Sequence, residues 1–146
     1  MPQFCIFTPT YNRRHCLPKL FKSLVSQTKM DFEWLVIDDG STDDTESLIK
    51  SFADIAPFQV HYVAVENGGK QRAMNQAAFI TTAPMFMCVD SDDWLIPEAI
   101  EVFSSYWEEN KSDETLAGLI CPRAIVENGQ LVRSPVMPDL TRCNAW

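Results

Sequence analysis

The chain has 146 residues, of which 46% are hydrophobic, and a net charge of −8. This length allows one domain with a full core and is too short for two ordinary domains. The acidic balance argues against nucleic acid or an anionic membrane surface as the main partner. No apolar run approaches the roughly 18–20 residues of a membrane span, and the start, Met1-Pro2-Gln3, does not resemble a signal peptide. We therefore expect a cytoplasmic protein with no transmembrane segment in this chain, and peripheral membrane association stays open for the full-length protein.

Short apolar runs alternate with amphipathic stretches as far as about Ala124, which is typical of βαβ units and a mostly parallel sheet. The predicted strands are residues 4–8, 32–37, 60–65 and 85–89, and the last of these reads as a buried strand. The predicted helices are residues 17–27, 45–52 and 70–79, followed by a helix with Pro97 in its first turn that reaches about Trp107. The fold class is α/β.

The pattern weakens after Asn110. Residues 116–124 resemble one more strand, and residues 126–132, around Asn128-Gly129, resemble a hairpin. The last ten residues have no periodicity, so we expect residues 125–146 to be weakly structured. A large aromatic residue, Trp146, on such a terminus suggests a chain cut before its natural end. We expect residues 1–146 to form a single, truncated domain.

The cysteines form an odd set of five without Cys-x-x-Cys spacing: Cys5, Cys16, Cys88, Cys121 and Cys143. We interpret them as free, mostly buried thiols, since reducing compartments keep such thiols unpaired. His15 and His61 lack the spacing of metal ligands and are interpreted as structural.

Acidic residues follow two of the predicted strands. Asp38 and Asp39 follow residues 32–37, while Asp90, Asp92 and Asp93 follow residues 85–89. Ionised carboxylates within about 4–6 Å of each other disfavour each other's charge, so we expect a cation to offset them. Mg²⁺ and Mn²⁺ are often held by one or two carboxylates plus substrate phosphates, and the Asp-x-Asp pair suits that role.

The alternative is that these acids cap helix N-termini, where a carboxylate satisfies free N–H groups and the helix dipole. It applies to Asp92 and Asp93 and to Asp43 and Asp44. We favour capping for Asp43 and metal binding for Asp90 and Asp92.

Polar loops also follow the other two strands, and ligands of open α/β sheets bind outside the carboxyl ends of the strands. Together the four loops outline a site for a nucleoside diphosphate. Tyr11 can stack on a base, or it can instead pack under its loop. Asp39 can accept the imino N–H of a uracil, and Lys70 or Arg72 can face the base or the phosphates, although a surface role for Arg72 is equally open.

At the same edge, Asp90 can hold ribose hydroxyls and Asp92 can reach a cation that bridges the two phosphates. Such a cation would also stabilise a departing nucleoside diphosphate. The chain has neither Gly-x-Gly-x-x-Gly after its first strand nor Gly-x-x-x-x-Gly-Lys-Ser/Thr, which excludes dinucleotide and P-loop sites.

Four motifs in order give the chain a family resemblance. They are Thr8-Pro9-Thr10-Tyr11-Asn12-Arg13, residues 32–43 ending in Ile37-Asp38-Asp39-Gly40-Ser41-Thr42-Asp43, Asn67-Gly68-Gly69-Lys70 with Ala73 and Asn75, and Val89-Asp90-Ser91-Asp92-Asp93. With these motifs the chain resembles the N-terminal half of inverting glycosyltransferases of family 2, which have the GT-A fold. The resemblance runs from Phe4 to about Pro97.

The resemblance implies a Rossmann-like three-layer fold whose C-terminal acceptor half is missing. It also implies a hexosyltransferase of cell-surface polysaccharide biosynthesis, with a sugar-nucleotide donor, most often a UDP-sugar, and Mg²⁺ or Mn²⁺ held by Asp92 with Asp90. The donor-binding positions that it implies are Thr8, Pro9, Thr10, Tyr11, Arg13, Asp38, Asp39, Gly69, Lys70, Asn75, Asp90 and Ser91.

In this family the general base comes from a second half of the protein, beyond the Asp-x-Asp motif. We therefore name no catalytic residue, and the acceptor, whether glycan, lipid or protein, is unknown. Glu108 and Glu109 are interpreted as a solvated helix face.

A competing interpretation is a non-catalytic module, either one that binds a sugar nucleotide or a regulatory one. A phosphoacceptor signalling domain is disfavoured, because it needs paired acids after its first strand, where this chain has Thr8-Pro9-Thr10-Tyr11.

Overall fold

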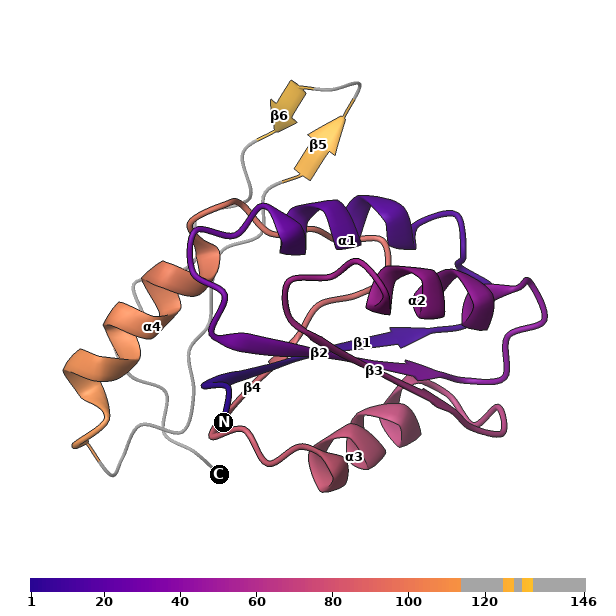
Figure 1. The fold of residues 1–146 in the computed structure, drawn as a ribbon, viewed down its shortest axis with the longest axis horizontal. Helices are drawn as coiled ribbons and strands as arrows, with labels where there is room; N and C mark the ends of the chain where they lie inside the picture. The colour runs from indigo at the N-terminus through magenta and orange to yellow at the C-terminus, as the bar shows by residue number, and fades with distance from the viewer. Residues whose placement is uncertain (114–124, 128–129, 133–146) are drawn as a thin grey trace. The chain divides into compact units, whose positions relative to one another are not determined.

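The computed structural model of the protein describes residues 1–113, 125–127 and 130–132. The chain divides into two compact units, Met1–Ser105 and Tyr106–Trp146. Figure 1 shows the order of the elements: β1 (Phe4–Thr10), α1 (Leu17–Val25), β2 (Phe32–Asp38), α2 (Thr45–Ala53), β3 (Gln59–Ala64), α3 (Lys70–Ile80), β4 (Met85–Cys88), α4 (Ala99–Asn110), β5 (Ile125–Glu127) and β6 (Gln130–Val132). None of the helices in these described ranges has both the length and the apolar character needed to cross a bilayer.

The first unit is built on a four-stranded sheet with the order β3-β2-β1-β4. All three strand pairs are parallel, and the β1–β2 register runs from Phe4 opposite Phe32 to Thr10 opposite Asp38. The α/β class and the parallel sheet are therefore confirmed. Because the strands are parallel, their carboxyl ends lie at one edge, which we call the carboxyl edge.

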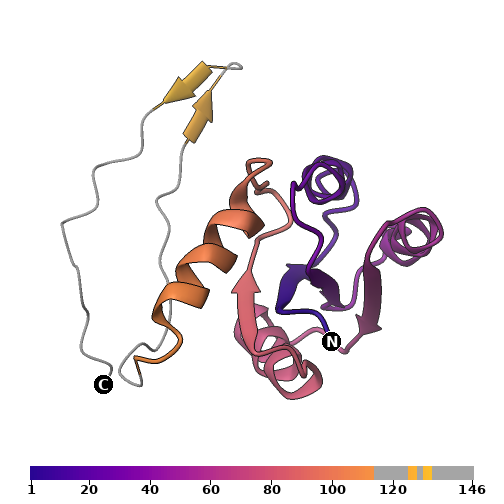
Figure 2. The same cartoon turned by 60° about the vertical axis from the view of Figure 1, so that its left-hand side comes forward.

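Helices cover both faces of the sheet, with α1 and α2 on one face and α3 on the other (Figures 1 and 2). Side chains of one strand point alternately to the two faces. Ile6 and Trp34 accordingly belong to the core beside α1 and α2, whereas Phe7 and Leu35 pack with Ala73 of α3. This is the expected three-layer arrangement.

Two expectations for β4 and the turn after it are wrong. In the described part of the chain β4 pairs only with β1 and forms the edge of the described sheet, and its side chains alternate between half-buried and exposed. Phe86 stacks on Phe7 with ring centroids 5.5 Å apart and is still 37% exposed. Pro97 lies in a turn before α4, which begins at Ala99.

The cysteines are less buried than expected. Of the three that the structure describes, all are free, but only Cys5 is buried; Cys16 is half-buried and Cys88 is exposed. Burial raises the pKa of Cys5 to about 11, so its thiol stays protonated at neutral pH. Cys121 and Cys143 lie outside the described residues.

The second unit contains the predicted hairpin strands. β5 and β6 pair antiparallel, with Ile125 opposite Val132. The predicted turn at residues 128–129, the strand at residues 116–124 and the last ten residues lie outside the described residues. Weak structure over residues 125–146 therefore stays a prediction.

Hydrogen bonds join the loops that follow β1 and β2. Asn12 donates its backbone N–H to Ser41 Oγ over 2.9 Å, and its Oδ1 accepts the N–H of Thr42 over 2.8 Å. Arg14 donates its backbone N–H to Asp43 Oδ2 over 2.9 Å. These bonds fix the start of the β1–α1 loop against the β2–α2 loop.

The predicted capping of α2 is wrong. The N-cap residue is Asp44 and not Asp43, and its side chain makes no capping hydrogen bond. An N-cap residue usually has β-region dihedrals, whereas Asp44 is left-handed with φ 58° and ψ 23°. Asp43 instead accepts the Thr45 hydroxyl over 2.6 Å as well as the Arg14 N–H.

We predict that Thr8→Val destabilises the fold. Trp34 is fully buried, and its Nε1–H donates to Thr8 Oγ1 over 3.0 Å. Valine fills similar space but leaves the indole N–H unpaired, which should cost about 1–3 kcal/mol of unfolding free energy in urea titrations. Thr82→Val, at an exposed side chain, is the control and should change stability by less than about 0.5 kcal/mol. An equally small loss for Thr8→Val would contradict the prediction.

We also predict an acid-sensitive contribution from Asp43. Burial by itself would raise the pKa of Asp43, but hydrogen bonds from the Thr45 hydroxyl and the Arg14 N–H outweigh it and hold the pKa below the ordinary 3.8. A depressed folded-state pKa gives stability that is present above 3.8 and is lost as pH falls through the lower folded value.

Asp43→Asn should therefore flatten the loss of unfolding free energy between about pH 5 and pH 2, measured by urea titration at each pH. Thr45→Val, which removes one of the donors, should flatten it in part. A pH profile of Asp43→Asn that superimposes on that of the parent protein would exclude this role.

Candidate functional site

The loops after the four parallel strands meet at the carboxyl edge (Figure 1). These are the loops in which the sequence places its polar motifs. The structure thus brings the predicted motifs together, and the partner of each side chain decides what it can do.

Asp39 fixes the loop that leads into α3. Its carboxylate is nearly buried, with Oδ1 accepting the N–H of Gly68 and Oδ2 that of Gly69, each over 2.8 Å. Asn67 Nδ2 donates to the Asp39 carbonyl over 2.9 Å. Gly69 is the N-cap of α3 with φ 87°, a backbone conformation that glycine adopts without strain. Since a carboxylate has about four lone-pair sites, these two bonds leave acceptor capacity for a ligand.

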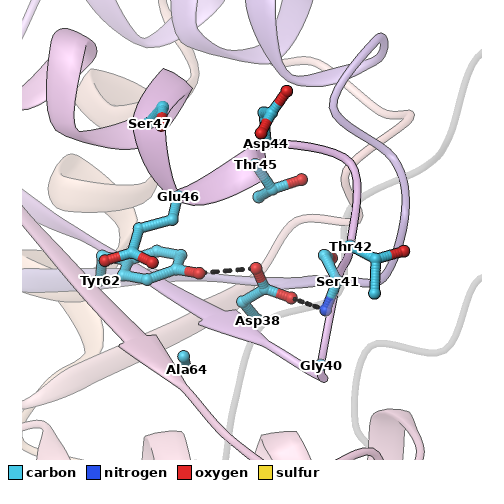
Figure 3. Close-up of a pocket in the computed structure, with 10 residues that line it drawn as sticks. All are labelled: Asp38, Gly40, Ser41, Thr42, Asp44, Thr45, Glu46, Ser47, Tyr62 and Ala64. Carbon is cyan, nitrogen blue, oxygen red and sulfur yellow. Dashed lines mark hydrogen bonds between the residues drawn. The ribbon is translucent and has the colours of Figure 1, made fainter.

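Asp38 is a supporting residue on the other side of β2. Its Oδ1 accepts the N–H of Ser41 over 2.8 Å, and its Oδ2 accepts the Tyr62 hydroxyl over 2.7 Å (Figure 3). Burial, followed by the hydrogen bond to Asp38, raises the pKa of Tyr62. A cavity of about 280 Å³ lies beside the pair, and its lining comes from the ends of β2 and β3 and the start of α2: Asp38, Gly40, Ser41, Thr42, Asp44, Thr45, Glu46, Ser47, Tyr62 and Ala64. Asp38 therefore faces this cavity and holds the ends of β2 and β3 together.

The Asp-x-Asp pair is balanced by cations from two other loops. Lys70 Nζ, at the first residue of α3, lies 2.5 Å from Asp90 Oδ1, and Arg13 Nη1 lies 2.6 Å from Asp92 Oδ2. The hydrogen bond and charge of Asp92 raise the pKa of Arg13. Lys70 and Arg13 thus offset the charge of the two acids in this structure, and the expected divalent metal stays a prediction.

The alternative that Asp92 and Asp93 cap a helix is excluded. The Asp93 N–H donates to the Asp90 carbonyl over 3.0 Å and closes a turn, but the next helix begins only at Ala99. Asp92 and Asp93 therefore do not act as helix caps here.

The motif after β1 contains both buried and accessible residues. Thr8 and Thr10 are buried, and Thr8 accepts a hydrogen bond from Trp34. Both threonines therefore lie beneath the surface of the site and support it. The Thr10 hydroxyl has no hydrogen-bond partner in the described part of the chain. Pro9 is half-buried, and Tyr11 is 50% exposed, which favours an accessible ring over the core-packing alternative.

The remaining predicted positions are spread over α3 and the turn after β4. Ser91 is buried, whereas Asn75 is exposed, and its Oδ1 accepts a weak bond from Gln71 Nε2 over 3.4 Å. The exposed Arg72 lies against Gly68, where an added Cβ would meet Arg72 Cδ at 2.5 Å. Arg72 therefore covers the loop that Asp39 holds.

Gln27 is a residue of this region that the sequence analysis missed. It is buried after α1 and hydrogen-bonds to the segment that follows the Asp-x-Asp pair. A signal was present, because Gln27 continues the apolar stripe of Leu17, Leu20 and Leu24 at helical spacing.

The donor set of the Asp-x-Asp pair fits a metal that is shared with a ligand. Among residues 1–113, 125–127 and 130–132, no group of three or more histidine, cysteine or acidic side chains is placed to hold a metal alone. Mg²⁺ and Mn²⁺ need fewer protein ligands when substrate phosphates complete their coordination. Asp90 and Asp92 can supply those protein ligands.

Comparisons with known proteins agree with this geometry. Residues 5–134 match the family model described as Glycosyl transferase family 2. The poly(ribitol-phosphate) β-N-acetylglucosaminyltransferase TarS of Staphylococcus aureus strain Mu50 is 30% identical over 118 residues, which are 80% of this chain and 21% of TarS. The chain thus spans about a fifth of the length of this relative.

Solved structures of S. aureus TarS 1–349 share the fold. The complex with UDP has a TM-score of 0.71 at 26% identity and covers 84% of this chain and 38% of that chain. The complex with UDP-GlcNAc has a TM-score of 0.69 at 27% identity and covers 84% and 37%. Because the family match extends over most of the sequence and these structures share its sheet, the chain belongs to glycosyl transferase family 2 and has the GT-A fold.

Proposed function

We propose that this chain binds a nucleoside-diphosphate sugar, with UDP as the nucleotide, at the carboxyl edge and forms the donor side of a glycosyl transfer site. The observation that carries the proposal is the pairing of Asp90 with Lys70 and of Asp92 with Arg13 at one edge. This arrangement offers two carboxylates to a cation and two cations to a diphosphate. Support for UDP comes from TarS, whose solved complexes contain UDP and UDP-GlcNAc.

Each side chain has a role in this proposal. The exposed Tyr11 ring stacks on the base, an interaction worth on the order of 1–3 kcal/mol in nucleic-acid sites. Asp39 uses its remaining acceptor capacity for the uracil N–H, and Asp90 accepts ribose hydroxyls. Asp92, with Asp90, holds Mg²⁺ or Mn²⁺, while Arg13 and Lys70 turn to the phosphates.

The proposed reaction is a single displacement with inversion. The acceptor oxygen forms a bond to the anomeric carbon while the bond from that carbon to the diphosphate oxygen breaks, and the acceptor proton passes to a base. A bound divalent cation would neutralise the charge that develops on the departing diphosphate. We assign no base and no acceptor to this chain, and its cytoplasmic location stays a prediction.

We predict metal-dependent binding of UDP. Calorimetric titration of the chain with UDP, GDP and ADP, each with and without Mn²⁺, should show tightest binding for UDP with Mn²⁺. Asp92→Asn should reduce the gain from Mn²⁺ by at least about tenfold, since it removes a metal ligand. Asp54→Asn, at an exposed acid at the end of α2, is the control and should bind as the parent does. Equal UDP affinity with and without Mn²⁺ in the parent chain would overturn the proposed metal site.

We also predict that Arg13 competes with the metal for Asp92. The Arg13–Asp92 pair is about half exposed, with side-chain exposures of 48% and 54%, and such pairs contribute about 0–1 kcal/mol. Arg13→Ala should therefore bind Mn²⁺ alone about two- to fivefold more tightly, measured by electron paramagnetic resonance of free Mn²⁺. Arg14→Ala, which removes a neighbouring charge but keeps this pair, should change Mn²⁺ affinity less. Weaker Mn²⁺ binding by Arg13→Ala would exclude the competition.

A further inference from the structure

Gln27 is a buried polar side chain whose amide is fully engaged. It is 5% exposed and lies just beyond α1. Its Nε2 donates to the carbonyls of Ser23, over 3.0 Å, and Ile96, over 2.8 Å, while its Oε1 accepts the N–H of Ile100 over 3.1 Å. A buried amide is costly unless its hydrogen bonds are made, and here both its donors and its acceptor are used.

The partners of Gln27 lie on either side of one turn. Ile96 belongs to the segment of residues 94–98 that follows the acids after β4, and Ile100 is the second residue of α4. The first N–H groups of a helix have no partner within the helix. Gln27 therefore caps α4 from a distant part of the chain and, with the same side chain, fixes the segment that connects α4 to the Asp-x-Asp pair.

Further contacts attach the same segment to α1 and to the residues that follow it. They are the hydrogen bond from Leu95 N–H to Ser23 Oγ over 3.2 Å, that from Thr28 N–H to the Pro97 carbonyl over 2.9 Å, and Lys19 Nζ over the Trp94 ring at 3.1 Å from its centroid. The Ser23 side chain is itself buried, and its bond to Leu95 is part-buried, as is the bond from Gln27 to Ile96. Four successive residues of the segment, 94–97, thus each contact α1 or the residues that follow it, and the contact of Ile96 is made by the buried Gln27.

The carboxylates of Asp90 and Asp92 make ion pairs that are in contact with solvent. Asp92 is held by an ion pair with Arg13 that is about half exposed, and exposed ion pairs restrain side chains poorly. The backbone hydrogen bond from the Asp93 N–H to the Asp90 carbonyl, over 3.0 Å, closes the turn before residues 94–98, and Lys70 pairs with the Asp90 carboxylate. The hydrogen bonds of Leu95, Ile96, Pro97 and Ile100 downstream therefore limit how far the turn can move.

We propose that Gln27 is a positioning residue for the Asp-x-Asp pair, which keeps Asp90 and Asp92 at the spacing that a metal–diphosphate complex requires. This inference rests on the proposed function. Gln27 does not touch the ligand in this proposal, and its effect appears only in the part of the affinity that depends on metal.

The test is Gln27→Met, which keeps the length of the side chain and removes its hydrogen bonds. The gain in UDP affinity on adding Mn²⁺, measured by calorimetry, should fall about tenfold, while UDP affinity without metal should stay within about twofold of the parent. Hydrogen exchange of the Ile100 amide should accelerate by at least about tenfold, because its acceptor is lost.

Two further variants separate positioning from general stability. Ile49→Ala removes a buried side chain of α2 that has no bond to residues 94–98, so it should lose stability and keep the full gain from Mn²⁺. Ser23→Ala removes the acceptor of the Leu95 N–H and should lower the gain from Mn²⁺ about two- to threefold. If Gln27→Met does not fold, Ser23→Ala with an unchanged gain from Mn²⁺ overturns the inference.

The outcomes also separate this inference from the proposed function. If the parent chain gains no UDP affinity from Mn²⁺, the metal site of the proposed function is wrong and the inference fails with it. If the parent gains affinity and Gln27→Met gains as much while Ile100 exchanges faster, only the inference is wrong. An equal fall in Ile49→Ala would assign the effect to lost stability and would also refute it.

Discussion

The carboxyl edge of the sheet depends on donors that balance the acids of its loops. Five acids at this edge accept hydrogen bonds or ion pairs from donors on another segment: Asp38 from Tyr62, Asp39 from Gly68 and Gly69, Asp43 from Arg14, Asp90 from Lys70, and Asp92 from Arg13. Because each donor lies on a different segment from its acid, the bonds that offset repulsion also join the loops. The same network of contacts therefore balances the charges at this edge and holds its loops together.

Burial divides this network into two kinds of contact. Asp38 and Asp39 are neighbours in sequence, but successive side chains at the end of a strand point to opposite faces. Asp38 therefore bonds to Tyr62 beside α2, whereas Asp39 bonds to the loop before α3. Both are nearly buried, where losing a partner of a charged group is costly. The pairs of Asp90 and Asp92 are more exposed, so a ligand can replace their partners at low cost.

The sequence predicted the layers because periodicity reports burial. It also predicted that the polar loops meet at one edge, because parallel strands end at the same edge of a sheet. It did not predict features that depend on distant contacts. An apolar run such as that of β4 occurs both in edge strands and in buried strands, so it does not report burial by itself. The left-handed backbone of Asp44, whose side chain makes no capping bond, has no sequence signature. Gln27 lies on the apolar stripe of its helix, but its role becomes visible only with Ile96 and Ile100 in place.

These contacts imply different mobility on the two sides of the proposed site. On the side proposed for the base, Asp39 accepts two hydrogen bonds from backbone N–H groups of its loop, so the acceptor proposed for uracil is held in place without a ligand. On the side of the phosphates, Lys70 and Arg13 occupy the acids that a metal would take, so binding requires an exchange of partners. Such an exchange requires side chains that can change conformation while the backbone stays in place. The part-buried hydrogen bonds of Gln27, Ser23 and Asp39 hold that backbone in place, and the side chains that would move are those of the exposed ion pairs.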